Sequence, residues 1–133
     1  MKKKIAIIGA GIAGLTFANL LKKNSEHEFM LYEKEDSLSL DEGYGIQLST
    51  NSIKILNQIN FEKINNKKIF HPKTIDFYNI QNEKICDLNL SKFNSAEVKY
   101  TTLQRSTLIE FLKENIYTQH LRFGKKNKRG VRT

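Results

Sequence analysis

The sequence predicts an α/β fold whose first part is a unit of two parallel β-strands joined by a helix. Three observations support this prediction. A short β-branched run, Lys4–Ile8, ends at a glycine, which is typical of a buried strand. Apolar residues then recur at helical spacing over residues 12–23, and a second strand-like run covers residues 28–33. The three segments fit within about 33 residues, the size of one such unit with a right-handed crossover.

The elements that follow are predicted from local signals. Residues 34–45 are polar and contain glycine, so they predict a loop. Ser49 or Thr50 is a suitable N-cap for a helix that ends at Asn60. The rest of the chain predicts, in order, a surface connection over residues 61–72, a β-hairpin of residues 74–80 and 84–90, a strand at residues 98–103, a helix at residues 106–116 and a strand at residues 120–123.

The positive charge of the chain is concentrated at its C-terminal end. The 133 residues carry a net charge of +8. Six of the 22 basic residues lie within residues 122–133, so only 16 basic residues accompany the 14 acidic ones in the rest of the chain. A strongly basic protein suggests a nucleic acid or an anionic membrane as partner. Because the chain before residue 122 is nearly neutral, this interpretation is weakened.

Other features of the composition narrow the class of protein. The single cysteine, Cys86, cannot form an intramolecular disulfide, and we expect it to be a small packed residue of the hairpin. The apolar segment near the N-terminus is interrupted by Asn19 and Lys22 and is too short to span a bilayer. Its glycines also argue against a signal peptide. The three histidines lack the spacing of metal ligands. We therefore expect a cytoplasmic protein with no transmembrane segment and no bound metal.

The strongest functional signal is a glycine motif between the first predicted strand and the first predicted helix. Residues 9–14 (Gly-Ala-Gly-Ile-Ala-Gly) fit the pattern G-x-G-x-x-G. In this pattern Gly9 makes the tight turn, Gly11 lets the backbone approach a pyrophosphate, and Gly14 lets the helix pack closely on the strand. The N-terminus of a helix also attracts anions. The motif therefore predicts a Rossmann-like dinucleotide site that includes Ala10, Ile12 and Ala13.

An acidic residue stands at the matching position further along the chain. Glu33 ends the second predicted strand, 19 residues after Gly14. A carboxylate there accepts hydrogen bonds from the adenosine ribose hydroxyls and repels a 2′-phosphate, so the ligand is not expected to be NADP. These residues alone do not separate NAD from FAD. The alternative is a glycine-rich turn that binds no ligand, with Glu33 as an ordinary strand-end residue.

Three sequence blocks together resemble a known family. The first is Ile7–Leu15, which includes the glycine motif. The second is residues 43–51 (Gly-Tyr-Gly-Ile-Gln-Leu-Ser-Thr-Asn), and the third is residues 103–108 (Leu-Gln-Arg-Ser-Thr-Leu). In this order and spacing the blocks resemble the FAD-dependent aromatic-ring monooxygenases of the para-hydroxybenzoate hydroxylase and salicylate hydroxylase type.

The resemblance implies a role for individual residues. The glycine motif would hold the FAD pyrophosphate, Glu33 the adenosine ribose, and Gly45 would lie near the flavin. Arg105 would reach the phosphate and ribityl region, with Gln104 a weaker candidate beside it. An arginine at a helix start is unfavourable for the helix dipole, so an anionic partner explains it better than the helix does. Members of the family usually have an arginine shortly before the second block, where this chain offers only Lys34.

The resemblance also implies the domain organisation. Residues 1–69 would be an FAD-binding, Rossmann-like portion, residues 70–103 the start of a β-rich substrate domain, residues 104–124 a return to the FAD-binding portion, and residues 125–133 a basic tail. The matched region is about the first third of a family member. We therefore expect an incomplete fold, assign no catalytic residue, and expect that this chain alone is too short to be active.

Three functions are compatible with the sequence. The preferred one is the FAD-binding N-terminal portion of a monooxygenase which, as a whole protein, uses NAD(P)H and O2 to hydroxylate a small organic substrate. The alternative is a separate module that binds NAD or ADP without redox chemistry. A nucleic-acid-binding protein is less favoured, because no specific nucleic-acid motif is present. Aromatic residues of the second half are spaced like the core of strands rather than as a recognition platform: Phe77, Tyr78, Phe93 and Tyr100.

Overall fold

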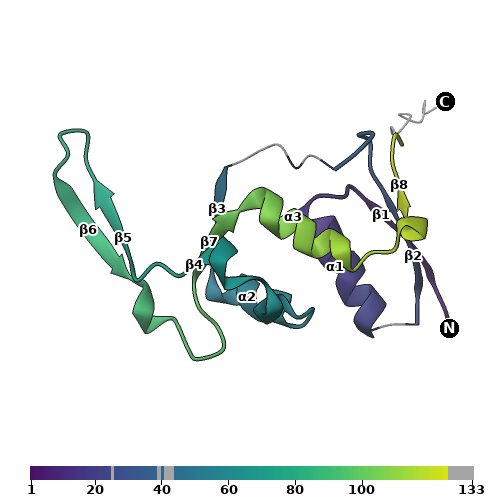
Figure 1. Cartoon of the computed structure of the whole chain (residues 1–133), viewed down its shortest axis with the longest axis horizontal. Helices are drawn as coiled ribbons and strands as arrows, with labels where there is room; N and C mark the ends of the chain where they lie inside the picture. The colour runs from purple at the N-terminus through teal and green to yellow at the C-terminus, as the bar shows by residue number, and fades with distance from the viewer. Residues whose placement is uncertain (25, 39, 41–43, 126–133) are drawn as a thin grey trace. The chain divides into compact units, whose positions relative to one another are not determined.

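The computed structural model describes residues 1–24, 26–38, 40 and 44–125 (Figure 1). The chain divides into two compact units. Unit 1 comprises residues 1–43 and 105–133, and unit 2 comprises residues 44–104. Unit 2 is therefore an insertion between two separated parts of unit 1.

Unit 1 contains the predicted strand–helix–strand unit. Strands β1 (Lys4–Ile8) and β2 (Glu28–Tyr32) pair in parallel and are connected by α1 (Ile12–Asn24). Strand β8 (Leu121–Arg122) pairs in parallel with the other side of β2, so the sheet order is β1-β2-β8. The α/β fold class is thereby confirmed, and the last strand lies within the predicted residues 120–123.

Helix α1 packs against α3 (Arg105–Glu114), and a short 3-10 helix, η4 (Thr118–His120), leads from α3 towards β8. The buried apolar side chains of unit 1 come from both of its long helices and all three strands and include Ile7, Leu15, Ala18, Leu31, Leu108, Leu112 and Leu121. The strand residues that alternate with Ile7 are exposed, and Ile8 is 75% exposed. Parallel sheets are usually covered on both faces. In the described part of unit 1, this second face of β1 has no such cover.

A buried amide joins the two helices of unit 1. Asn19 of α1 is 4% exposed, and its Nδ2 donates hydrogen bonds of 2.8 Å to the carbonyl oxygens of Leu15 and Leu112. Leu112 lies in the last turn of α3, where carbonyl groups have no partner within the helix. Asn19 therefore stabilises the end of α3 as well as the contact between the helices.

We expect Asn19→Leu to lower the free energy of unfolding by about 1–3 kcal/mol, because it leaves the Leu112 carbonyl buried without a donor while the side chain keeps the same number of heavy atoms. Urea unfolding monitored by circular dichroism measures this loss. Lys22→Met is the control, since the Lys22 Nζ donates to the Asn115 carbonyl at 2.7 Å in an exposed position. The control should lose less than about 1 kcal/mol, and an equal loss in both variants would contradict a special role for Asn19.

Unit 2 is built on a small antiparallel sheet. Strand β7 (Thr101–Gln104) lies between β3 (Gly45–Leu48) and β4 (Ile69–Phe70). The register places Gly45 opposite Gln104. Helix α2 (Thr50–Asn57) follows β3 and buries Ile53 and Leu56.

Unit 2 contains short elements that the sequence signals do not indicate. No strand is predicted at residues 45–48, yet β3 forms there by pairing with β7. The predicted surface connection over residues 61–72 is largely exposed, but it contains the 3-10 helices η1 (Phe61–Lys63) and η2 (Asn66–Lys68) and strand β4, and its first residue is buried. Phe61 is only 3% exposed. The physical reason is a sharp turn at Asn60, whose left-handed φ of 68° ends the helical segment and returns the chain to the sheet.

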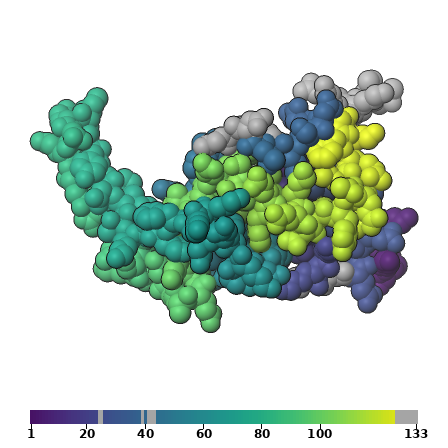
Figure 2. Space-filling view, in the orientation of Figure 1, coloured from purple at the N-terminus to yellow at the C-terminus, as the bar shows by residue number. Residues whose placement is uncertain are grey.

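The predicted hairpin is present, as β5 (Thr74–Tyr78) and β6 (Lys84–Asn89), followed by the 3-10 helix η3 (Leu90–Lys92). In Figures 1 and 2 it stands clear of the rest of unit 2. Most of its side chains are accordingly exposed, which corrects the expectation of packed strand residues: Phe77 is 48% and Tyr78 54% exposed, and Cys86 is exposed as well. Phe93, which follows η3 and was grouped with them, is 57% exposed. Tyr100 lies in a different part of unit 2, half-buried, with its hydroxyl 3.0 Å from the Gln47 Oε1.

An ion-pair network lies on one side of the hairpin. The Lys84 Nζ is 3.0 Å from a carboxylate oxygen of Asp76 and 3.1 Å from one of Asp87. These two hydrogen bonds raise the pKa of Lys84. Because directly opposed Asp76 and Asp87 would otherwise repel each other, the lysine makes their pairing across the strands tolerable.

No helix among the described residues is long and apolar enough to cross a membrane. Apart from Lys125, the predicted basic tail lies outside the described residues.

Candidate functional site

The glycine motif forms the turn between β1 and α1. Gly9 has a φ of +97°, which side chains other than glycine rarely adopt, and its N–H donates to the Tyr32 carbonyl at 2.7 Å. A Cβ on Gly14 would overlap the carbonyl oxygen of Gly9. Glycine at positions 9 and 14 is therefore required by the fold of the turn itself.

Gly11 differs from the other two glycines. Its carbonyl accepts the first helical hydrogen bond, from the Leu15 N–H at 2.9 Å, so Gly11 is the N-cap of α1. A Cβ built on Gly11 meets no atom within 4 Å, and its φ lies outside the left-handed region. Nothing in the described residues therefore requires a glycine here. The space beside Gly11 is open, at the positive end of a helix dipole.

The Glu33 carboxylate is tied to this turn. One carboxylate oxygen, Oε2, accepts a hydrogen bond of 2.7 Å from the Ala10 N–H. The other, Oε1, accepts from the N–H groups of Lys34 at 2.7 Å and Glu35 at 3.1 Å. The backbone of Glu33 continues the pairing of β2 with the β8 segment, because its N–H donates to the Arg122 carbonyl at 2.8 Å. The carboxylate is thus held beside the turn by three backbone N–H groups, one from the turn and two from the residues that follow Glu33.

These contacts determine the charge state of Glu33. Partial burial alone would raise the pKa of its carboxyl group, but hydrogen bonds from the N–H groups of Ala10, Glu35 and Lys34, together with the Lys34 charge, outweigh burial and lower it. Glu33 is therefore ionised at neutral pH. A carboxylate accepts about four hydrogen bonds, so capacity remains for one further donor such as a ribose hydroxyl.

The structure distributes the predicted site residues over the two units. The turn 9–14, Glu33, Lys34 and Arg105 belong to unit 1, with Arg105 as the first residue of α3. The Lys34 side chain is exposed and its Nζ lies 3.3 Å from a Glu35 carboxylate oxygen. Gly45 and Gln104 belong to unit 2, where they are brought opposite each other by the pairing of β3 with β7.

The sequence pattern did not show two features of this site. The hydrogen bond to Glu33 is donated by the backbone N–H of Ala10. Because nearly every residue type has this group, the sequence does not indicate the contact. Asn19, which joins α1 to α3, looked like a polar interruption of an apolar segment. Its spacing of four residues after Leu15 on one helix face was the only available signal. Among the residues that the structure describes, no group of three His, Cys, Asp or Glu side chains could hold a metal ion.

The chain resembles known proteins in sequence. A family model described as an NAD(P)-binding Rossmann-like domain matches residues 7–41, which include the glycine turn and Glu33. The FAD-dependent monooxygenase anuJ of Penicillium roqueforti (strain FM164) is 32% identical over 86 residues, which are 63% of this chain and 9% of that protein.

Two solved structures have a similar fold. The tetrameric form of 2-methyl-3-hydroxypyridine-5-carboxylic acid oxygenase matches with a TM-score of 0.71 and 22% identity, over 92% of this chain and 31% of that one. HpxO of Klebsiella pneumoniae, solved with FAD and uric acid, matches with a TM-score of 0.71 and 20% identity, over 94% of this chain and 31% of that one. The chain thus spans about a third or less of the length of the proteins it matches. The comparisons confirm the resemblance to flavin-dependent monooxygenases and the Rossmann-like fold.

Proposed function

We propose that this chain is the FAD-binding N-terminal portion of a flavin-dependent monooxygenase, and that unit 1 binds the ADP half of FAD. One observation carries this proposal. The ionised Glu33 carboxylate is hydrogen-bonded to the N–H of Ala10 in the turn, and the same turn has open space beside Gly11 at the start of α1. In this proposal Glu33 accepts the hydrogen bond from the ribose, and the open space beside Gly11 takes the pyrophosphate. The hydrogen bond from Ala10 keeps these two parts of the site next to each other.

The described residues fit an ADP group. The pyrophosphate would lie against Gly11 and the first turn of α1, Ile12 and Ala13, whose N–H groups have no partner within the helix. The absence of a side chain at Gly11 is explained by this close approach, because the fold itself does not require it. Glu33 would accept a hydrogen bond from the adenosine ribose.

The flavin half of the cofactor would involve other residues. We assign Arg105 to the phosphate and ribityl region, with Gln104 beside it, Gly45 near the flavin and Lys34 as a further basic candidate. In this proposal residues 1–69 and 104–124 form the FAD-binding portion, and residues 70–103 begin the substrate domain. When bound, FAD supplies the redox chemistry with which the whole protein, using NAD(P)H and O2, would hydroxylate a small organic substrate.

Ligand titrations test the cofactor assignment. We expect FAD and ADP-ribose to bind to the full chain, and FMN, which lacks the adenosine part, to bind at least a hundredfold more weakly; flavin fluorescence and calorimetry measure these affinities. NAD+ that binds as tightly as FAD would favour the alternative, a dinucleotide-binding module without redox chemistry. The match of residues 7–41 to an NAD(P)-binding domain is the observation that keeps this alternative open.

A substitution at Glu33 tests the ribose contact. The ionised carboxylate should make the chain prefer ADP-ribose over 2′-phospho-ADP-ribose by tenfold or more, equivalent to about 1.4 kcal/mol, and Glu33→Gln should bring this ratio close to one. Glu35→Gln is the matched control, because the Glu35 side chain pairs with Lys34 and only its backbone N–H contacts Glu33. If the preference for ADP-ribose is unchanged in Glu33→Gln, Glu33 does not contact the ribose. This conclusion does not depend on how the substitution changes the stability of the protein.

A further inference from the structure

The segment that follows β8 runs beside the loop that carries Glu33. The N–H of Glu33 donates to the Arg122 carbonyl at 2.8 Å, and the N–H of Lys125 donates to the Glu33 carbonyl at 2.8 Å. The N–H of Gly124 donates to the Glu35 carbonyl at 2.9 Å. Among the residues that the structure describes, no other backbone-to-backbone hydrogen bond reaches Glu33 or Glu35. The main chain of this loop is therefore held by a segment that lies far away in the sequence.

The arrangement depends on the backbone conformation of Gly124. In an extended strand, consecutive N–H groups point to opposite sides of the strand. The N–H groups of Gly124 and Lys125 are consecutive, yet both donate to the loop of residues 33–35. Gly124 has a left-handed φ of 64°, which takes the chain out of the extended conformation at this point. The two N–H groups therefore depend on a conformation that glycine adopts readily and a β-branched residue does not.

A side chain at position 124 would disturb this arrangement mainly through the backbone. A Cβ built on Gly124 lies 3.2 Å from the Oδ1 of Asp36, but that oxygen belongs to an exposed side chain that is able to move aside. The left-handed φ is the larger obstacle, because the backbone must change to relieve it. Such a change would turn the Gly124 N–H away from Glu35.

The loop held in this way determines the hydrogen bonds of the Glu33 carboxylate. Its Oε1 accepts from the N–H groups of Lys34 and Glu35, and Glu35 is the residue whose carbonyl accepts from Gly124. If that pairing is lost, Glu35 is released and the donors to Oε1 move with it. The carboxylate would then keep only the contact of its Oε2 with the Ala10 N–H. A single hydrogen bond leaves the carboxylate free to turn about it.

We propose that Gly124 is a positioning residue of the nucleotide site. Its left-handed conformation aligns residues 122–125 with residues 33–35 and thereby fixes the direction of the Glu33 carboxylate. In this inference Gly124 acts through the loop and not by contact with the ligand. The consequence for ligand affinity rests on the proposed function, whereas the consequence for Glu33 itself does not.

The pH titration of Glu33 tests the positioning without any ligand. Burial alone would raise the pKa of Glu33, but the hydrogen bonds from Ala10, Glu35 and Lys34 and the charge of Lys34 lower it. Gly124→Val should weaken the hydrogen bonds from Glu35 and Lys34, so the pKa of Glu33 should rise above its wild-type value; ¹³C NMR of the carboxyl group measures it.

The matched variant at the same position is Gly124→Asn. It adds the same Cβ, but asparagine tolerates a left-handed φ, so the pKa of Glu33 should stay at its wild-type value. An unchanged pKa of Glu33 in a folded Gly124→Val protein, or an equal rise in Gly124→Asn, would overturn the proposal. If Gly124→Val does not fold, Gly124→Ala takes its place, with a smaller rise expected.

Binding of ADP-ribose tests the consequence for the site. Gly124→Val should lower the affinity for ADP-ribose about tenfold, as expected for the loss of one hydrogen bond to a charged group. It should also bring the preference over 2′-phospho-ADP-ribose closer to one, which a merely structural role would not do. Gly124→Asn should retain both properties, and calorimetry measures them.

The outcomes separate this inference from the proposed function. If the wild-type chain binds no ADP-ribose, the proposed function fails, and the titration of Glu33 still decides the role of Gly124. If the wild-type chain binds ADP-ribose and Gly124→Val binds it with the same preference, the positioning role fails while the proposed function stands.

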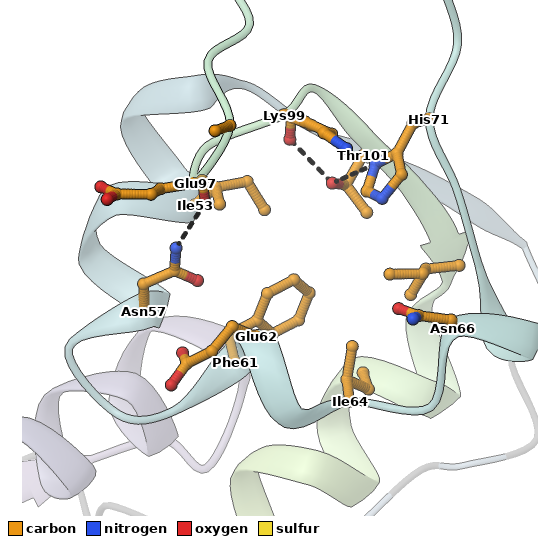
Figure 3. Close-up of a pocket in the computed structure, with 12 residues that line it drawn as sticks. Ile53, Asn57, Phe61, Glu62, Ile64, Asn66, His71, Glu97, Lys99 and Thr101 are labelled. Atoms are coloured by element: carbon orange, nitrogen blue, oxygen red, sulfur yellow. Dashed lines mark hydrogen bonds between the residues drawn. The ribbon is translucent and has the colours of Figure 1, made fainter.

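Two further variants control for effects that do not pass through the loop. Asn82, in the turn of the hairpin of unit 2, also has a left-handed φ of 64°, so Asn82→Val introduces similar strain elsewhere. Thr101→Val removes a buried hydroxyl of unit 2 that donates to the Lys99 carbonyl at 2.8 Å and lies 3.2 Å from the His71 Nδ1 (Figure 3). Both should lower stability and leave the pKa of Glu33 unchanged. A rise in either control equal to that in Gly124→Val would contradict the proposal.

Discussion

Gly11→Val should abolish binding of FAD and ADP-ribose, with a loss of affinity of at least a hundredfold, while the chain remains folded. The valine side chain would occupy the open space beside the start of α1, where the pyrophosphate is proposed to lie. The fold tolerates it because a Cβ at this position meets no atom within 4 Å. The expected change in stability is about 1 kcal/mol or less, from replacing a glycine N-cap.

Calorimetry of both ligands and urea unfolding of the same preparations measure the two effects. Thr16→Val is the control, because it places the same side chain further along α1, beyond the turn. Retained affinity in a folded Gly11→Val protein would exclude the turn as the phosphate site, and unfolding of that protein would show that the fold itself requires a glycine there.

Gly14→Ala should have the opposite profile, with a loss of about 3 kcal/mol or more in the free energy of unfolding. Its Cβ would overlap the carbonyl oxygen of Gly9, which belongs to the backbone and cannot rotate away, and would also lie 3.4 Å from a methyl group of Leu31. Because Gly9 is held by its hydrogen bond to Tyr32, relief requires α1 to move away from the sheet.

The same substitution at Gly11 is the matched control for this prediction. Gly11→Ala adds the same methyl group three residues earlier, in open space, and should change the unfolding midpoint only slightly. Unfolding midpoints in urea, together with the yield of soluble protein, compare the two variants. Equal stability of Gly14→Ala and Gly11→Ala would show that the turn is not as closely packed as the structure indicates.

Much of unit 1 could be predicted from the sequence because its signals are local. The β-branched run of β1, the glycine turn and the helical spacing of α1 follow one another without interruption, and the position of Glu33 follows from the length of that unit. Strand β3 could not be predicted in this way. Its partner β7 begins at residue 101, and the Gly45–Leu48 segment has too few residues to show an alternation of its own.

Burial was the other property that the sequence did not determine. Alternation along the hairpin correctly predicted strands, but alternation specifies faces and not what covers them, so Phe77 and Cys86 were expected to be packed and are exposed. The reverse holds for Phe61. It follows Asn60 in an asparagine- and lysine-rich segment, yet the left-handed turn carries it into the interior of unit 2.

The pairing of Gly45 with Gln104 has a consequence for how the chain folds. Strand β8 must join β2 across the whole of residues 44–104, and closing a flexible loop becomes less favourable by about 0.6 kcal/mol for each doubling of its length. Once β3 pairs with β7, the two ends of the insertion are neighbours, and the loop that remains to be closed between β2 and β8 no longer includes the length of the insertion. Early folding of unit 2 therefore assists the assembly of unit 1. Substitutions that weaken the pairing of β3 with β7 should destabilise the antiparallel sheet of unit 2 and should also slow the formation of the parallel sheet of unit 1.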